Sequence, residues 1–192
     1  MISLLIPVTD VDEAITCMIE AEKKCLNIDR VNFVLRFNSA DVDNLSRISE
    51  IPEYSLCICS GDSKNRADEV NEMCAVACGE YLMYWHQEWR FETRMWEQHL
   101  QGISMGCTAT GHCFINRDIY RLLGHYSLHE NVNQYVFTVG QLSGLLGQNK
   151  VVTSGETKTG GFDGEANKIC LDRDVQLIRS EIEKTTPLST GT

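Results

Sequence analysis

The chain has 192 residues, of which 43% are hydrophobic and 23% are charged, a composition typical of one globular domain with a short appendage. It carries 17 Lys and Arg residues against 27 Asp and Glu residues, for a formal net charge of -10. Because no basic run could neutralise a row of phosphates, the composition argues against a nucleic-acid partner. A single nucleotide remains compatible with it, since backbone N–H groups and a metal ion can offset a diphosphate locally.

Hydropathy and cysteine usage indicate the cellular compartment in which the protein is expected. No run approaches the roughly 18 apolar residues that a membrane span needs, and the apolar opening at residues 2–6 is too short for a signal peptide. The nine cysteines lie mostly among apolar residues, without zinc-knuckle spacing, and are interpreted as buried thiols. We therefore predict a protein without a membrane span, in the reducing cytoplasm.

The first half of the chain alternates short apolar runs with amphipathic stretches, which is typical of a parallel sheet covered by helices. Acidic residues after Asp10 favour a helix start there, because the helix dipole stabilises negative charge in the first turn. Ser39 is expected to cap a short helix, and Gly79 to terminate the third helix. Strands are predicted at residues 2–8, 31–37, 54–60 and 81–85, and helices at residues 10–25, 39–48 and 68–78.

The second half has weaker patterns. Residues 106–115 mix small and apolar residues in a strand-like way, and residues 153–164 are rich in Gly, Thr and Ser, as in a loop or linker. Helices are predicted at residues 92–100, 116–124, 134–146 and 172–183. The expected organisation is an α/β domain over residues 1–150, a Gly/Thr-rich loop over 151–170, and a C-terminal helix with a flexible tail over 171–192.

Three segments together resemble a known family. Residues 2–9 (ISLLIPVT) are similar to the first strand and nucleotide loop of GT-A glycosyltransferases of the large inverting family 2. Residues 71–82 (NEMCAVACGEYL) look like the helix, turn and strand that lead to that family's metal site. Residues 111–117 and 122–126 resemble the acceptor-side segment of short glycosyltransferase-like proteins common in phage and environmental sequences.

The resemblance covers residues 1 to about 146 and implies a fold and an activity. The implied fold is the GT-A, or nucleotide-diphospho-sugar transferase, fold: a Rossmann-like three-layer α/β/α sandwich with a mostly parallel central sheet. A dinucleotide-binding or flavodoxin-like domain is disfavoured, because no Gly-x-Gly-x-x-Gly follows the first strand. The implied partners are a UDP- or GDP-linked sugar as donor and an unknown acceptor.

The family's metal motif is altered in this chain. Where the family has Asp-x-Asp, which holds a divalent cation against the donor diphosphate, this sequence has His86, Gln87 and Glu88. His86 and Glu88 are the candidate ligands for Mn²⁺ or Mg²⁺, since imidazole and carboxylate both bind Mn²⁺, although a single carboxylate lowers affinity for a hard cation. The alternative is that both are polar residues in a solvated loop between Trp85 and Trp89.

The family's catalytic base is an Asp or Glu on the segment that here comprises residues 128–134. Glu130 is the carboxylate in that segment, and His129 is the alternative base, with an ordinary pKa near 6.5. Each is equally well explained as a surface residue that caps the helix starting near Asn133.

Nucleotide contacts need only a loop backbone, a carboxylate or amide, and an apolar floor. Asn38 stands where the family usually has an Asp that reads the base or ribose, and an amide adds a donor that a carboxylate lacks. Asn71 is equally compatible with a helix-surface amide. The candidate nucleotide-binding residues implied by the resemblance are Pro7, Val8, Thr9, Asn38, Arg66 and Asn71.

Two functions remain open from the sequence. The first is an inverting transferase that moves a sugar from its nucleotide to an acceptor in one in-line displacement. The second is a catalytically degenerate relative that keeps the fold as a nucleotide-binding or structural protein. The residues at 86–88, the amide at Asn38 and the amide-rich base segment favour the second function.

Overall fold

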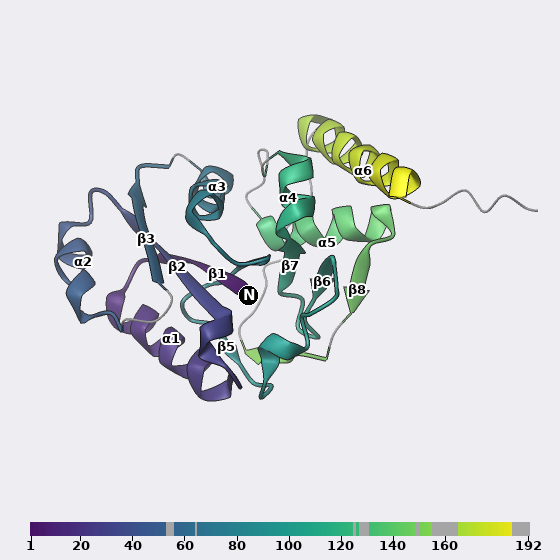
Figure 1. Ribbon diagram of the computed structural model, residues 1–192. Coiled ribbons are helices and arrows are strands. Elements are labelled where there is room, and N and C mark those ends of the chain that lie inside the picture. The colour runs from purple at the N-terminus through teal and green to yellow at the C-terminus, as the bar shows by residue number, and fades with distance from the viewer. Residues whose placement is uncertain are drawn as a thin grey trace, which may run out of the picture.

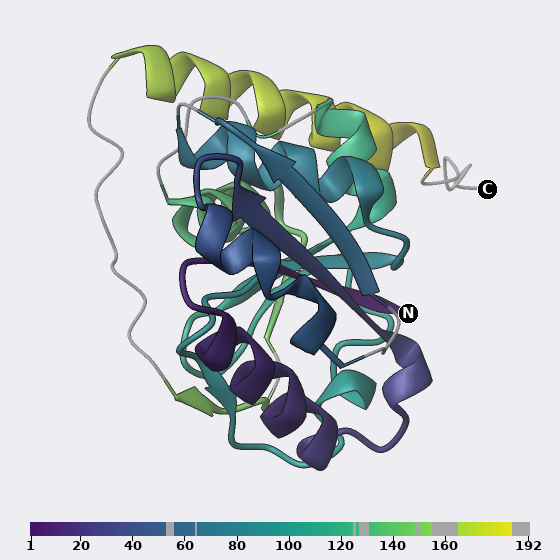
Figure 2. The same cartoon turned by 90° about the vertical axis from the view of Figure 1, so that its left-hand side faces the viewer.

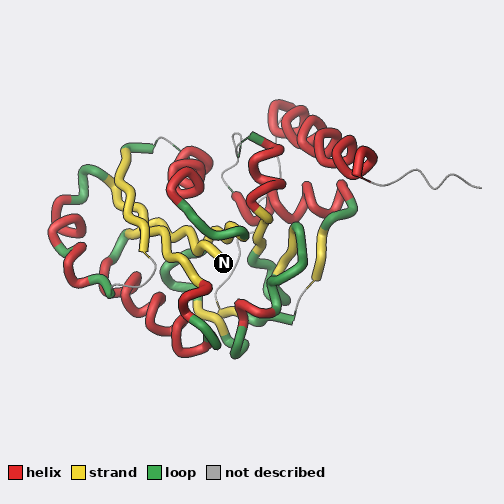
Figure 3. The backbone as a smooth tube through the Cα atoms, in the orientation of Figure 1, coloured by secondary structure: helices red, strands yellow, loops and turns green. Residues whose placement is uncertain are grey.

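The protein, described here from a computed structural model, is an α/β domain built on one large twisted sheet (Figures 1 and 3). The structure describes residues 1–52, 56–63, 65–124, 126, 131–148, 150–154 and 165–185. The sheet runs in the order β3 (Leu56–Gly61), β2 (Val31–Asn38), β1 (Ile2–Val8), β4 (Tyr81–Tyr84), β7 (Cys113–Asn116), β6 (Met105–Cys107) and β8 (Leu146–Gln148). A second, two-stranded sheet pairs β5 (Arg90–Phe91) with β9 (Thr153–Ser154).

Strands β1 to β4 are parallel, and only the far side of the sheet contains antiparallel pairs. β1 lies between β2 and β4, with Ile2 opposite Val31 and Tyr81. β7 runs antiparallel to both β4 and β6, whereas β8 is parallel to β6. Every residue of β1 is buried, as expected for a strand covered on both faces, which explains its continuous apolar run. The predicted mostly parallel three-layer fold is confirmed.

Helices cover the two faces of the sheet separately, as Figure 2 shows for α1 and α6. One face carries α1, whose first turn is capped by the Asp10 side chain, together with α2. The other face carries α3, α4, α5 and α6 in a second apolar cluster. Their bounds are α1 Val11–Lys24, α2 Val42–Ser46, α3 Arg66–Val76, α4 Arg117–Leu123, α5 Val132–Ser143 and α6 Glu165–Thr185.

Several predicted helix bounds need correction. The short helix after β2 is capped by Asp41 and not by Ser39, because the Asp41 carboxylate accepts the N–H of Asn44. The third helix ends at Val76, so Gly79 lies in the turn beyond it. α5 stops at Gly144, which takes a positive φ of 79°, and Leu146 belongs to β8. α6 begins at Glu165, ahead of the predicted start.

The helix predicted over residues 92–100 is wrong, and a single 3₁₀ turn at Trp96–Gln98 takes its place. Met95, immediately before it, has a left-handed φ of 53°, which interrupts any helix. Trp96 is fully buried, stacks on Phe91 at 3.8 Å between ring centroids, and donates its indole N–H to the carbonyl of Ala21. Tertiary packing of one aromatic side chain therefore outweighs the local helical spacing.

The prediction that all nine cysteines are buried thiols is also wrong. Cys107 and Cys113 form a disulfide where they face each other across the β6–β7 hairpin, and the segment predicted as one strand is this hairpin. Cys78 is an exposed free thiol. Because disulfides persist mainly in oxidising compartments, the cysteine argument for a reducing cytoplasm loses its support. Within the described part of the chain, no helix is long and apolar enough to cross a membrane.

Candidate functional site

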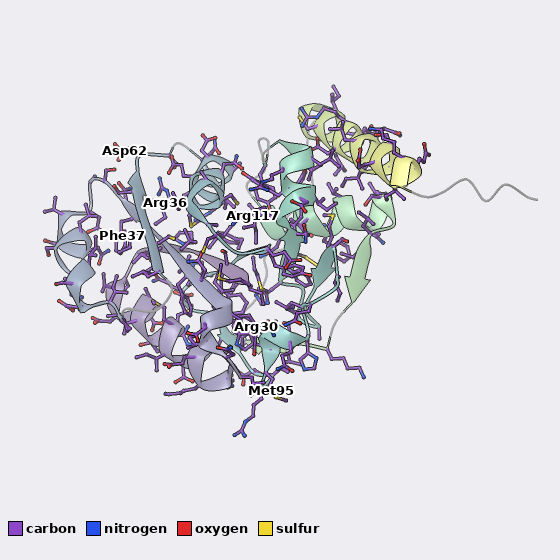
Figure 4. All side chains as sticks on the ribbon, in the orientation of Figure 1. Arg30, Arg36, Phe37, Asp62, Met95 and Arg117 are labelled. Carbon is purple, nitrogen blue, oxygen red and sulfur yellow. A yellow bond between two sulfur atoms is a disulfide. The ribbon has the colours of Figure 1, made fainter. Side chains whose placement is uncertain are left out.

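The carboxyl ends of the central strands β2, β1 and β4 meet at one edge of the sheet. In open α/β sheets this edge is where ligands bind. The loops that leave these strands begin at Ser39, Thr9 and Trp85, so three segments far apart in sequence converge there. Figure 4 shows Arg36 and Phe37, near the end of β2, far from Arg30, which precedes the start of that strand.

Gln87 holds the β1 loop against the β4 loop. Its carboxamide oxygen accepts the backbone N–H of Thr9 at 2.9 Å and that of Asp10 at 3.3 Å, and its amide nitrogen donates to the Thr9 hydroxyl at 2.9 Å. From the other side, Asn44 donates to the Thr9 carbonyl at 3.1 Å. Thr9 is thus fixed by α2 and by the loop after β4, and Gln87 is buried.

An open hollow of about 500 Å³ lies beside this clamp, at the ends of β1 and β2. Val8 and Thr9 form one wall, and Asn38 with the following loop forms the other. The Asn38 side chain is exposed and accepts the N–H of Ala40, which turns the chain at the rim. Val8, at the end of β1, and Thr9, just after it, therefore line the same hollow as Asn38, whereas Pro7 is buried within the strand.

Two carboxylates of the hollow, Asp41 and Asp43, were missed by the sequence reasoning. Both lie in the segment that follows β2, where Asp41 caps α2 and Asp43 is exposed. The available signal was their position immediately after a buried strand, where carboxylates approach a ligand-binding edge. The prediction instead placed the helix start at Ser39 and gave these two residues no role.

In the loop after β4, Glu88 projects into solvent, whereas His86 is half-buried with its ring 5.7 Å from that of Trp89 between centroids. The imidazole Nδ1 lies 3.7 Å from a Glu88 carboxylate oxygen, and the Glu88 side chain is 71% exposed. Among the described residues, no group of three His, Cys, Asp or Glu side chains is placed to hold a metal ion. His86 and Glu88 supply only two ligands, so they can hold a cation only if the oxygen atoms of a bound phosphate group complete its coordination shell. Mg²⁺ and Mn²⁺ commonly bind phosphates in this way.

Arg66 lies close to the end of β4, at the first position of α3. Its guanidinium sits over the ring of Tyr84, 5.7 Å from the centroid, and pairs with Glu69 at 2.5 Å. The structure therefore brings Arg66 to the same strand whose loop carries His86 and Glu88. The Arg66 charge is already paired with the Glu69 carboxylate in this structure.

Asn71 is not brought into this group. Its amide donates to the Tyr126 carbonyl at 2.8 Å and accepts from the Tyr120 hydroxyl and the Tyr126 N–H. These three bonds tie α3 to the chain around α4, so every polar atom of this side chain already has a protein partner. The candidate bases His129 and Glu130 lie outside the described residues.

His112 is a fully buried neighbour of the β4 loop. Its ring packs 4.0 Å from Trp89 and 5.3 Å from Trp85 between centroids, and its Nδ1 shares a hydrogen bond with the Thr153 hydroxyl. The Nε2 atom has no hydrogen-bond partner in the part of the chain that the structure describes. Burial disfavours the charged imidazole and lowers the pKa of His112 to about 4.

We expect the buried His112 to make stability depend on pH. The unfolded histidine binds a proton near pH 6.5 but the folded one only near pH 4, so stability is lost as pH falls through this window. The loss is roughly 3 kcal/mol, at about 1.4 kcal/mol per pKa unit. Urea unfolding at several pH values should show that the free energy of unfolding of His112→Gln falls less with decreasing pH than that of the wild-type protein. In His99→Gln, at an exposed histidine, the free energy of unfolding should depend on pH as it does in the wild-type protein. If the free energy of unfolding depended on pH equally in His112→Gln and in the wild-type protein, His112 would not be the cause of the acid loss.

No protein-family model and no curated protein sequence matches the chain. Solved structures do match its fold. Staphylococcus aureus TarS 1-349 in complex with UDP superposes with a TM-score of 0.63 at 6% identity, covering 92% of this chain and 64% of that one. The mannosyltransferase PcManGT from Pyrobaculum calidifontis, in complex with GDP-Man and Mn²⁺, gives 0.62 at 10% identity, covering 96% and 64%. The complex of TarS 1-349 with UDP-GlcNAc gives 0.57 at 7% identity, with 92% and 66% coverage.

These similarities establish the fold. The mostly parallel sheet and its helices match those of GT-A glycosyltransferases, as the resemblance implied. The chain spans a little under two thirds of the length of the first two matched structures.

Proposed function

We propose that the chain is a glycosyltransferase that binds a nucleoside-diphosphate sugar across the carboxyl ends of β2, β1 and β4. The observation that carries the proposal is the clamp on Thr9 by Gln87 and Asn44, which joins the three loops into one surface. The ligands in the matched structures, UDP, UDP-GlcNAc and GDP-Man, support this choice of ligand class.

The nucleoside is proposed to occupy the hollow beside β2. Asn38, Asp41 and Asp43 place carboxylate and amide oxygens around it. Ribose hydroxyls and the N–H groups of uracil or guanine are donors, so an acceptor-rich rim suits a nucleoside better than a bare phosphate. Val8 supplies apolar contact in the same hollow.

The diphosphate is proposed to lie toward β4. Neighbouring strands are about 4.8 Å apart, so the ends of β2 and β4 are separated by roughly 10 Å, a span that a nucleoside diphosphate can bridge. Arg66 would oppose phosphate charge from α3, and His86 with Glu88 would hold Mn²⁺ or Mg²⁺ from the β4 loop. The ion would neutralise the departing diphosphate. The proposed reaction is sugar transfer with inversion, with Glu130 or His129 as the base. We also propose that the chain belongs to the short phage-like subgroup.

Calorimetric titration tests donor binding. UDP, GDP, UDP-GlcNAc and GDP-mannose would each be titrated with and without Mn²⁺. We expect at least one to bind with a Kd between about 1 µM and 1 mM. Glu88→Gln should weaken nucleotide binding in the presence of Mn²⁺ about tenfold, because it removes a charged metal ligand. His86→Asp should strengthen nucleotide binding in the presence of Mg²⁺.

Glu183→Gln is the matched control, since it neutralises an exposed carboxylate on α6 without touching the site. Its affinities should equal those of the wild-type protein. If no nucleotide binds at about 1 mM, with or without metal, the proposal fails.

A second candidate function is a nucleotide-binding protein without transferase activity. The specific observation in its favour is Gln87, whose carboxamide is turned inward and used to hold Thr9, leaving one carboxylate in the motif. Release of free nucleotide from a bound sugar donor separates the two candidates. Binding that is accompanied by slow donor hydrolysis or transfer supports the enzyme, whereas binding with no release over hours supports the second function.

A further inference from the structure

Both candidate metal ligands lie on one tight turn, at residues 86–89. The backbone N–H of Trp89 donates to the carbonyl of His86 at 2.9 Å, which places Gln87 and Glu88 at the corner of the turn. Such a hydrogen bond is enough to close a turn, and surface turns are usually mobile. The 86–89 turn has further contacts, and the next residue along the chain, Arg90, supplies the most direct of them.

The guanidinium of Arg90 is directed at the backbone of this turn. Its Nη1 atom donates to the carbonyl of Gln87 and, at 2.9 Å, to that of Trp89. The Gln87 carbonyl belongs to the peptide group that leads into Glu88, and the Trp89 carbonyl to the one that ends the turn. Hydrogen bonds from a charged donor are about twice as strong as neutral ones. Arg90 therefore fixes peptide groups on both sides of Glu88.

The same arginine ties the turn to the first helix. Its Nη2 atom donates to a carboxylate oxygen of Glu13, in the first turn of α1, at 2.7 Å, and the Arg90 side chain is only 20% exposed. Gln87 already links the turn to Thr9 in the loop just before this helix. The loops after β1 and β4 are thus joined at two points, one through a side-chain amide and one through an arginine.

The end of the turn is held by packing. The Trp89 ring lies 4.0 Å from that of His112 and 5.6 Å from that of Trp85 between centroids. Glu88 is consequently an exposed carboxylate on a backbone that is fixed before and after it. A binding loop that is ordered before its ligand arrives avoids the entropy cost of being ordered on binding.

We propose that Arg90 is a positioning residue, which holds the 86–89 turn in the conformation that presents His86 and Glu88 to a metal ion on the donor diphosphate. This inference rests on the proposed donor-binding function. Arg90 acts through the turn and not on the donor, since Glu13 already compensates its charge. The fixed turn would offset part of the affinity that is lost with a single carboxylate in the motif.

The first test needs no ligand. Arg90→Met keeps an apolar stem of similar length but removes every donor. In the ligand-free full chain, followed by NMR, we expect the Trp89 amide to exchange at least about tenfold faster in Arg90→Met than in the wild-type protein. The Trp85 amide, which donates to the Leu5 carbonyl at 2.9 Å, should exchange at the wild-type rate. Arg94→Met, at an exposed arginine four residues along, is the matched control and should leave both rates unchanged.

The second test is calorimetric titration of the same variants with UDP and GDP, with and without Mn²⁺. Arg90→Met should raise the Kd about tenfold with Mn²⁺, or about 1.4 kcal/mol, which is the cost of ordering the backbone of roughly one residue. Without Mn²⁺ the Kd should rise at most about threefold, because Asn38 and Asn44 still shape the hollow. Arg90→Lys keeps the charge beside Glu13 but lacks the planar fork, and it should change the Kd in the same direction. It replaces Arg90→Met if a melting curve shows that the methionine variant is unfolded.

Several results overturn the role of Arg90 alone. They are an unchanged exchange rate of the Trp89 amide, an unchanged Kd with Mn²⁺, an equal rise in Kd with and without Mn²⁺, or a wild-type affinity that does not respond to Mn²⁺. If the wild-type protein binds no nucleotide by about 1 mM, the proposed function fails and this role of Arg90 fails with it. The two failures are thus told apart by the wild-type titration.

Discussion

Gly79→Ala is expected to lower the free energy of unfolding by about 3 kcal/mol or more, because the backbone of β1 passes too close for a methyl group. A Cβ at Gly79 would lie 2.5 Å from the backbone nitrogen of Ser3 and 2.8 Å from the carbonyl carbon of Ile2. The Gly79 N–H also donates to the Ser3 hydroxyl, which in turn donates to the buried Asn32. The strand entry cannot move away without breaking this chain of hydrogen bonds.

Gly102→Ala is the control for this substitution. Gly102 has a φ of 76° and nothing within 4 Å of an added Cβ, so it reports the backbone strain of alanine without a clash. We expect a loss of about 1 kcal/mol there. Urea unfolding measures both variants, and a Gly79→Ala loss no larger than that of Gly102→Ala would contradict the close approach.

Arg36→Met is expected to cost about 2–3 kcal/mol, because it removes a buried guanidinium and its charged hydrogen bonds to two partly exposed carboxylates. The Arg36 side chain is only 4% exposed, and its guanidinium contacts Glu72 at 2.8 Å and Glu69 at 3.1 Å, as well as the Ser63 hydroxyl. Burial alone would raise the pKa of Glu72, but hydrogen bonds from Arg36 and Ser63 outweigh it and hold the pKa below its ordinary value. Methionine would leave Glu72 without its cation, whereas Glu69 would keep its ion pair with Arg66.

Arg47→Met is the matched comparison. Arg47 also joins two carboxylates, those of Asp12 and Glu50, but on the surface. Exposed ion pairs contribute little, so we expect a much smaller loss than for Arg36→Met. Denaturant titration at neutral pH should show a clearly larger loss of unfolding free energy for Arg36→Met than for Arg47→Met. Comparable losses would contradict a stabilising role of the buried Arg36. Arg36→Met combined with Glu72→Gln should regain part of the loss, since it removes the carboxylate left without its cation.

The central strands and first helix could be predicted because their sequence pattern and environment agree. β1 and β2 are mostly apolar, and both are buried on both faces apart from the exposed Asn38 at the end of β2. The first helix has an Asp10 cap and an apolar stripe that packs on the sheet. In these elements the local pattern and the tertiary contacts favour the same structure.

The second half was harder because long-range contacts decide it. The turn at Trp96 depends on Phe91 and Ala21, and helical spacing alone gives no sign of either contact. The disulfide did have a signal: Cys107 and Cys113 are six residues apart and flank a Thr- and Gly-containing segment, as a hairpin requires.

The candidate site was predictable as a place but not in its details. The strand ends at Thr9, Asn38 and His86 could be placed on one edge from the alternation of strands and helices. The role of Gln87 depends on Thr9, 78 residues away in sequence, so it could not be read from the motif. Asn71 likewise finds its partners around Tyr126, 55 residues further on.

Hydrogen exchange with mass spectrometry tests most directly that a nucleotide sugar binds at the carboxyl edge of the sheet. Exchange would be followed with and without saturating UDP or GDP, in the presence of Mn²⁺. We expect slower exchange in peptides that cover residues 8–10, 38–44 and 85–89, and unchanged exchange at residues 96–102 on the opposite edge. Protection confined to residues 96–102 or to the helices, with no change at the three strand ends, would contradict the proposed site.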